Sequence, residues 1–208
     1  MKRCLKHSVL IVLLLFGSSV FGEDAYTKTG KKVILNDDFT WKYAESAVVD
    51  LNTNMRKLER SSDHTSVLVS KYNTYSVYYN PANWFNAKAS NEAAEFGFEN
   101  TRKTSYSMLI YEGVEIPLET FPNLILENTK NVDPTAYIID IEDVSVNGMA
   151  GKIVKYHASS KGLNFIFYSF LTSGKFGSIH FIAFTLESNF DRELEGFDSL
   201  ISGLVVNK

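Results

Sequence analysis

The sequence predicts an α+β fold, in which a mostly antiparallel β-sheet is flanked by helices. Short segments rich in Val, Tyr and Phe, typical of strands, occupy residues 66–112. Four more such segments, separated by turn residues, follow in 136–187. Apolar side chains recur at helical spacing in 117–132 and again in 188–206. Strands and helices in separate blocks favour an antiparallel sheet with helices packed against it.

The first 22 residues have the pattern of a secretory signal. Three cations precede the apolar run Val9–Phe16: Lys2, Arg3 and Lys6. Small residues follow, which predicts cleavage after Gly22. A bilayer-spanning helix needs about 20 apolar residues, so this shorter run predicts no membrane anchor after cleavage. The single cysteine, Cys4, would leave with the signal.

Charge and cysteine content narrow the class of protein. The chain has 21 Lys and Arg against 24 Asp and Glu, and signal cleavage removes three of the cations. An acidic chain without a basic block predicts neither a nucleic-acid partner nor binding to anionic lipid. The mature chain would have no disulfide and must rely on a hydrophobic core. We expect export, with the periplasm favoured over the extracellular space.

A small hairpin is predicted within residues 30–43. An odd-length loop around 36–38 places five apolar side chains on one face: Val33, Leu35, Phe39, Trp41 and Tyr43. An isolated two-stranded hairpin is marginal in water, so this face must cover something. Packing on the chain's own domain is favoured. The alternative is a protein partner, which makes Phe39, Trp41 and Tyr43 the candidate interaction surface.

The hairpin is followed by a predicted amphipathic helix. Its apolar positions have helical spacing and end near Ser61: Ala47, Val48, Leu51, Met55 and Leu58. Hairpin and helix together form a predicted extension over 23–62. The main domain is then predicted over 63–208.

The first half of the main domain holds strands and one helix. Strands are predicted in 66–80, 93–101 and 104–113, with a break at 81–85. The helix over 117–132 has an apolar stripe of Leu118, Phe121, Ile125 and Val132, and Pro122 delays its start.

The last third predicts a four-stranded meander and a terminal helix. Asn147-Gly148 is a two-residue hairpin signal, and further turns fall at 159–162 and 173–175. Several strands are apolar on both faces, so both faces are expected to be covered. Ser188 is the predicted cap of the closing helix. The apolar stripe of that helix consists of Leu194, Phe197, Leu200, Ile201 and Leu204.

The order of these pieces resembles the PsbP-like superfamily over residues 67–206. The matching segments are YSVYYNPANWF, the central helix, VSVNGMAGKIVKYH and FDRELEGFDSLISGL. That superfamily includes PsbP, Ran-binding import factors and bacterial envelope lipoproteins. The resemblance implies an α/β/α sandwich that acts as a binding or assembly module without catalysis. Separately, Asp37-Asp38-Phe39-Thr40-Trp41 resembles a short hairpin motif of exported bacterial proteins, Asp-Asp-x-Thr-Trp, of no known activity.

The histidines offer little chemistry. The sequence has no phosphate-binding glycine loop, nucleophile elbow or zinc-protease motif. His64 lies in a polar stretch and is expected to be solvated. His157 and His180 fall in what we predict to be neighbouring strands. Ordinary, partly buried histidines are favoured over a shared metal site. No catalytic, cofactor or metal residue is therefore predicted.

Three other features have structural explanations. Asp140, Glu142 and Asp143 are predicted to form a solvated acidic rim and not a catalytic carboxylate pair. Turn formation explains Asn and Asp at 36–38 better than calcium binding. A ligand-stacking role is open to Trp84, but burial at a strand end is favoured.

The sequence therefore predicts an exported, non-catalytic binding or assembly module of the bacterial envelope, with an unidentified protein partner. The alternative is a periplasmic carrier of a small apolar ligand held between the sheet and its helices. The high aromatic content, 13% of residues, motivates this alternative. An enzyme is not expected, because it would need His157 or His180 beside a carboxylate in a cleft.

Overall fold

The computed structural model describes residues 24–26, 32–35, 40–43 and 55–207. The chain divides into two compact units, 1–47 and 48–208, and each is described by itself. The predicted signal, Phe39 and residues 44–54 of the predicted helix lie outside the described residues.

The first unit contains a three-stranded antiparallel sheet. It consists of β1 (Asp24–Tyr26), β2 (Lys32–Leu35) and β3 (Trp41–Tyr43) in the order β1-β2-β3. Val33 pairs with Tyr43 and Leu35 with Trp41 across β2 and β3. The connection between these strands therefore has an odd number of residues, as predicted. Strand β1 adds a third strand to the predicted hairpin.

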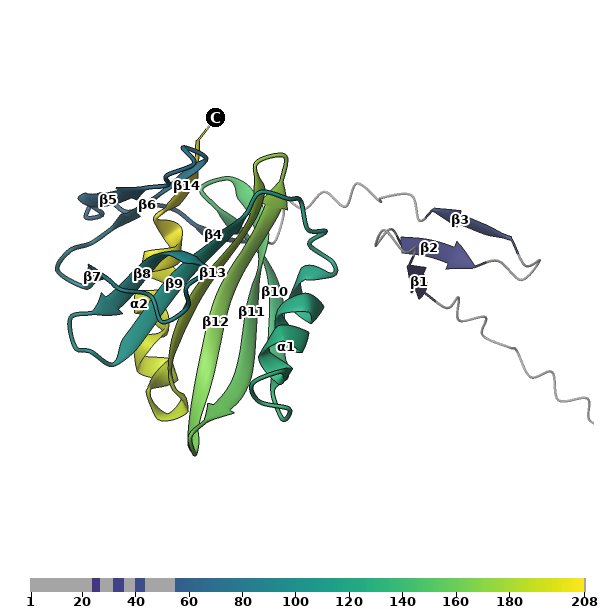
Figure 1. The fold of residues 1–208 in the computed structure, drawn as a ribbon. Coiled ribbons are helices and arrows are strands. Elements are labelled where there is room, and N and C mark those ends of the chain that lie inside the picture. Colours follow the sequence, from purple (N-terminus) through teal and green to yellow (C-terminus); the bar gives the residue numbers. More distant parts are fainter. Residues whose placement is uncertain (1–23, 27–31, 36–39, 44–54, 208) are drawn as a thin grey trace, which may run out of the picture. The chain divides into compact units, whose positions relative to one another are not determined.

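The second unit is built on an eight-stranded sheet with the order β4-β10-β11-β12-β13-β9-β8-β7 (Figure 1). Its strands are β4 (Arg56–Leu58), β7 (Trp84–Ala87), β8 (Ala94–Asn100), β9 (Ser105–Glu112), β10 (Tyr137–Val146), β11 (Met149–Ser160), β12 (Leu163–Gly174) and β13 (Gly177–Leu186). Strands β10 to β13 form the predicted antiparallel meander. Asn147 and Gly148 both have positive φ, 49° and 79°, as a type I′ turn requires.

Strand β4 corrects part of the predicted N-terminal helix. Residues Arg56–Leu58 are extended and pair in parallel with Val144–Val146 of β10. The side chain of Arg56 also binds Glu142 of β10, with 2.8 Å between Nη2 and Oε2. These contacts join segments about 86 residues apart, and they override the helical spacing of Met55 and Leu58.

Helix α1 (Phe121–Lys130) covers one face of the sheet. Pro122 lies in its first turn, which confirms the delayed start. Phe121 and Ile125 are buried against Val154, Tyr156 and Leu171 of the sheet. The predicted stripe is wrong at its end, because Val132 lies beyond the helix and is 80% exposed.

Helix α2 (Phe190–Ser202) covers the opposite face. Its Phe197 and Leu200 belong to the same core cluster as Ile153 and Phe170. Ile153 and Val154 are adjacent on β11, so the two helices lie on different faces. The sheet is thus covered on both faces, as predicted.

The start and end of α2 differ from the prediction. Ser188 lies in a short 3₁₀ turn, Glu187–Asn189, and Asn189 takes the cap position. At the other end, the stripe residue Leu204 has left the helix and opens β14 (Leu204–Val206). This strand pairs with β6 (Tyr75–Tyr79), which also pairs with β5 (Ser66–Val69). The three strands form a small second sheet.

The two faces differ in how much of the sheet is covered. A helix with its side chains is about 10 Å across and strands lie about 4.8 Å apart, so one helix covers about two strands. On the first face, α1 has ten residues and packs mainly over β11 and β12. It leaves apolar positions of β13 and β9 open beside it.

Candidate functional site

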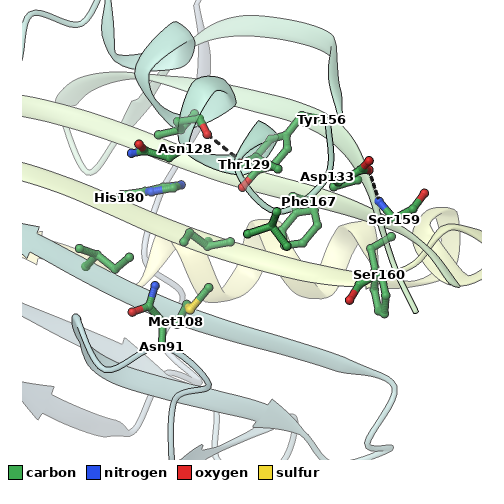
Figure 2. A pocket seen from close by; sticks show the side chains of 16 residues that line it. Asn91, Met108, Asn128, Thr129, Asp133, Tyr156, Ser159, Ser160, Phe167 and His180 are labelled. Carbon is green, nitrogen blue, oxygen red and sulfur yellow. Dashed lines mark hydrogen bonds between the residues drawn. The ribbon is translucent and has the colours of Figure 1, made fainter. Parts of the chain in front are cut away.

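The space beside α1 is a cavity of about 320 Å³ (Figure 2). Met108 of β9, Phe167 of β12 and Ile182 of β13 form its sheet side, and Ile125 and Asn128 of α1 form the helix side. Its walls are predominantly apolar. Their residues come from segments up to about 90 positions apart, so only the folded chain creates the cavity.

A second cavity, of about 500 Å³, continues the first along α1. The two share Asn91, Ile110, Ile125, Asn128 and His180. We call the continuous space the α1 groove. Its ligand-sized volume and apolar walls with a few polar groups are typical of small-molecule sites.

A row of four aromatic rings crosses the sheet at one side of the groove. Tyr156, Phe167, Phe184 and Tyr106 come from β11, β12, β13 and β9 in turn, with ring centroids 4.9, 5.3 and 5.7 Å apart. Each neighbouring pair is stacked, an arrangement that adds to the free energy of burial. Tyr156 and Phe167, at one end of this row, line the groove, and the other two rings continue the row beyond it.

His180 lies where the two cavities join, and its Nε2 is 3.1 Å from Oγ of Ser169. Burial lowers the pKa of His180 to about 3. Burial also raises the pKa of the Tyr156 hydroxyl, to about 12. Both groups are therefore uncharged near neutral pH, and the centre of the groove has polar atoms without charge.

Asp133 provides a negative charge at one end of the groove. Its Oδ1 accepts hydrogen bonds from the backbone N–H and the hydroxyl of Thr135, and Oδ2 accepts one from the N–H of Ser159 at 2.6 Å. These hydrogen bonds, with Thr135 first, hold the pKa of Asp133 below its usual range. Asp133 is 7% exposed and lines the cavity, with its carboxylate directed at the N–H of Ser159 (Figure 2).

The lowered pKa of His180 predicts a dependence of stability on pH. Below pH 6.5 the unfolded chain takes up a proton at this histidine, whereas the folded chain does not until about pH 3. Stability is therefore lost across this window as the pH falls, by up to about 1.4 kcal/mol per pH unit. In urea unfolding at several pH values, His180→Gln should flatten the curve between pH 6 and 4. Parallel curves for variant and wild type would contradict this assignment.

The structure changes the interpretation of His64. This side chain is buried and not solvated, with Nε2 3.1 Å from Oγ of Ser199 on α2. Its Nδ1 has no hydrogen-bond partner among the described residues. Burial lowers the pKa of His64. The polar neighbours in the sequence gave no sign of this contact, which joins residues 135 positions apart.

The prediction that His157 and His180 lie in neighbouring strands is wrong. His157 is on β11 and His180 on β13, with β12 between them. Their β12 partners are Ile166 and Leu171, about 17 Å apart along the strand. These two histidines therefore share no site. Within the described ranges, no group of three or more His, Cys, Asp or Glu is arranged to hold a metal ion.

The predicted acidic rim is solvated at Asp140 and Asp143, whereas Glu142 is half-buried. Asp140 is exposed, but Glu142 binds Arg56, and Asp143 accepts a hydrogen bond from Lys152 at 2.6 Å. Arg56 also binds Asp198 of α2 at 2.8 Å. Glu142 is thus part of an ion-pair network that joins β4, β10 and α2. The sequence missed this network because its members are far apart along the chain.

The remaining predicted residues have separate outcomes. Trp84 is 3% exposed and packs against Phe197 of α2, which confirms burial over ligand stacking. Trp41 and Tyr43 lie in β3 of the first unit.

Within the described ranges, neither helix has the length and apolar character needed to span a bilayer.

Solved structures provide the comparison for the fold. Cyanobacterial PsbP (CyanoP) from Synechocystis sp. PCC 6803 matches with a TM-score of 0.53 and 12% identity, over 68% of this chain and 92% of that protein. LpqN of Mycobacterium tuberculosis, described as involved in cell envelope biogenesis, matches at 0.45 and 10% identity, over 69% and 90%. The Ran-binding protein Mog1p of Saccharomyces cerevisiae matches at 0.45 and 10%, over 68% and 94%.

No protein-family model and no curated protein matches the sequence. The match to CyanoP, which covers almost all of that protein, agrees with the segments quoted above from residues 67–206. It also agrees with the antiparallel sheet covered by a helix on each face. The chain therefore has the fold of the PsbP-like superfamily.

Proposed function

We propose that the chain is an exported, non-catalytic binding module that holds a small apolar ligand in the α1 groove. The observation that carries this proposal is the open apolar face beside α1, lined by aromatic and aliphatic side chains. The N-terminal sequence supports export, through its cations, apolar run and small residues.

The groove favours a ligand over a purely structural role. On the opposite face, Phe170, Phe181 and Phe197 are completely buried, each at 0% exposure. Among the residues that line the groove, Leu124 keeps 43% exposure and Val114 keeps 63%. Filling the groove with an apolar molecule would remove such surface from water at about 25 cal/mol per Å². This gain is available to a ligand without any change in the sheet.

The polar groups of the groove support binding without catalysis. Ser169 and His180 have the contact expected of a nucleophile and its base. However, Ser169 is 0% exposed, so a ligand in the groove does not reach its hydroxyl. With a pKa near 3, His180 is also a weak base. A group that stays neutral suits the orientation of a ligand better than proton transfer.

The protein partner that ranks first from the sequence is the second candidate here, at Trp41 and Tyr43, which lie on β3 of the first unit. Trp41→Ala is expected to reduce capture of that partner in a pull-down from envelope extract. An unchanged pull-down together with lower stability would contradict this role.

Asn128→Trp tests the groove directly. Asn128 is an exposed residue of α1 that borders both cavities, so an indole there should occupy their junction. We expect the affinity for the neutral apolar dye N-phenyl-1-naphthylamine to fall at least tenfold. The measurement is dye fluorescence titrated against the full protein.

Asn123→Trp is the matched control for this experiment. Asn123 is exposed on the same helix and lines neither cavity. Dye binding by this variant should equal that of the wild type. Equal binding by both tryptophan variants, or no binding by the wild type, would contradict the proposed site.

A further inference from the structure

We propose that the α1 groove selects apolar molecules whose polar end is uncharged or cationic, with that end at Asp133, and that it rejects anionic amphiphiles. This inference rests on the proposed function and names the class of ligand. It follows from the charges of the lining residues, the state of Asp133 and the backbone at the start of α1.

The lining residues contain acids and no permanent cation. Among the described residues that border the two cavities, the ionisable ones are Asp133, Glu112, His180 and Tyr156, and none is Lys or Arg. Lys130, at the end of α1, pairs with Glu127 of the same helix at 3.2 Å. An anion in the groove would lose its water and meet only negative or neutral side chains, which is unfavourable.

The start of α1 offers little to an anion. Helix N-termini bind anions through free backbone N–H groups. Here Pro122 has no N–H, and the N–H of Phe121 donates to the carbonyl of Pro117 at 3.0 Å. The N–H of Leu124 donates to the carbonyl of Thr120 at 3.1 Å. At Phe121, Pro122 and Leu124 the backbone therefore has no free N–H to replace a Lys or Arg side chain.

The carboxylate of Asp133 can accept one more hydrogen bond, from a donor group of a ligand. A carboxylate has about four acceptor positions, and Thr135 and Ser159 use three of them. These hydrogen bonds stabilise the charged form, so the side chain stays ionised in its largely buried position. Ser160 lines the same cavity. An ammonium or a hydroxyl group fits this end.

The rest of the groove suits an extended apolar chain. The helix beside it has ten residues and is therefore about 15 Å long. Met108, Ile110, Ile125 and Ile182 lie along this length. His180, in its neutral state at the junction, does not oppose an apolar chain by charge.

Three probes that share an alkyl chain and differ in their head group test this selection. Dodecylamine, dodecanol and dodecanoate, each below its micelle concentration, would compete with N-phenyl-1-naphthylamine on the full protein at pH 7.5. We expect the amine and the alcohol to displace the dye and dodecanoate to be at least tenfold weaker than the amine. Asp133→Asn should weaken the amine about fivefold and leave the alcohol unchanged. Glu119→Gln, at an exposed acid that lines neither cavity, should change neither.

The possible outcomes separate the two proposals. If the dye and all three probes fail to bind, the proposed function is wrong, and this inference fails with it. If dodecanoate binds as tightly as the amine, the groove binds apolar ligands but the selection by charge is wrong. If Asp133→Asn leaves the amine unaffected, the placement of the polar end at Asp133 is wrong.

Discussion

Replacing Gly203 with alanine should lower the free energy of unfolding by about 3 kcal/mol, because the added methyl group meets backbone that has no room to move. Its Cβ would overlap the carbonyl oxygen of Tyr78, although real Cβ atoms essentially never come within 3.0 Å of an atom outside their own residue and its chain neighbours. Gly203 accepts a hydrogen bond from the N–H of Tyr78 at 2.8 Å. Relief of the clash must therefore separate β14 from β6.

Gly196→Ala is the matched control, in the middle of α2. A Cβ at this position would meet nothing within 4 Å, and Ala is a better helix former than Gly. We expect this variant to gain about 0.5–1 kcal/mol. Urea unfolding at pH 7 measures both. If Gly203→Ala is as stable as the wild type, the junction between α2 and the small sheet is not packed as described.

Glu193→Ala should also cost about 3 kcal/mol, because a buried carboxylate at the start of α2 is the shared acceptor of several donors. Glu193 is 2% exposed and accepts hydrogen bonds from Asn100, Arg102, Thr104 and Arg192. Its removal leaves the buried amide of Asn100 without this partner. Loss of the acid from the first helical turn adds to the cost.

Glu193→Gln separates charge from shape. Burial raises the pKa of Glu193, but the hydrogen bonds from Arg102, Arg192 and Thr104 outweigh it, so the pKa lies below its ordinary value of 4.5. The stabilisation by the ionised form is present above pH 4.5 and is lost as the pH falls through the lowered pKa. The Gln variant should be less stable than the wild type at pH 7, and this deficit should shrink below pH 4.5. A deficit that is constant with pH would contradict the role of the charge.

The local sequence pattern correctly predicted those parts of the fold in which strands that follow one another in the sequence also pair with one another. The meander from β10 to β13 follows from its turn residues, above all Asn147-Gly148, and from strands that are apolar on both faces. Burial of Phe197, Leu200 and Ile201 follows from their helical spacing. In these segments the local preference and the tertiary contacts agree.

The errors lie where distant segments meet. Helical spacing at Met55 and Leu58 did not indicate that β4 would add to the edge of β10. Polar neighbours suggested a solvated His64, although α2 buries it against Ser199. Leu204 continues the stripe of α2 in sequence, but pairing with Val77 draws it into β14. In each case a long-range contact overrides a weak local preference.

The groove was only partly foreseeable. Aromatic content and double-sided strands indicated apolar surface that needs a cover. The position of the open part depends on the length of α1 and on its packing over β11, which the sequence does not determine. Asp133 gave no signal in the sequence, because its contact with Ser159 joins residues 26 positions apart.

The most direct test of the central claim is native mass spectrometry of residues 23–208, purified from the periplasm without refolding. We expect a species heavier than the apo chain that loses its extra mass on denaturation, and Asn128→Trp should lack it. The released molecule should be apolar, with a neutral or cationic polar end. A clean apo mass for the wild type, together with no uptake of dodecylamine or dodecanol, would contradict the claim.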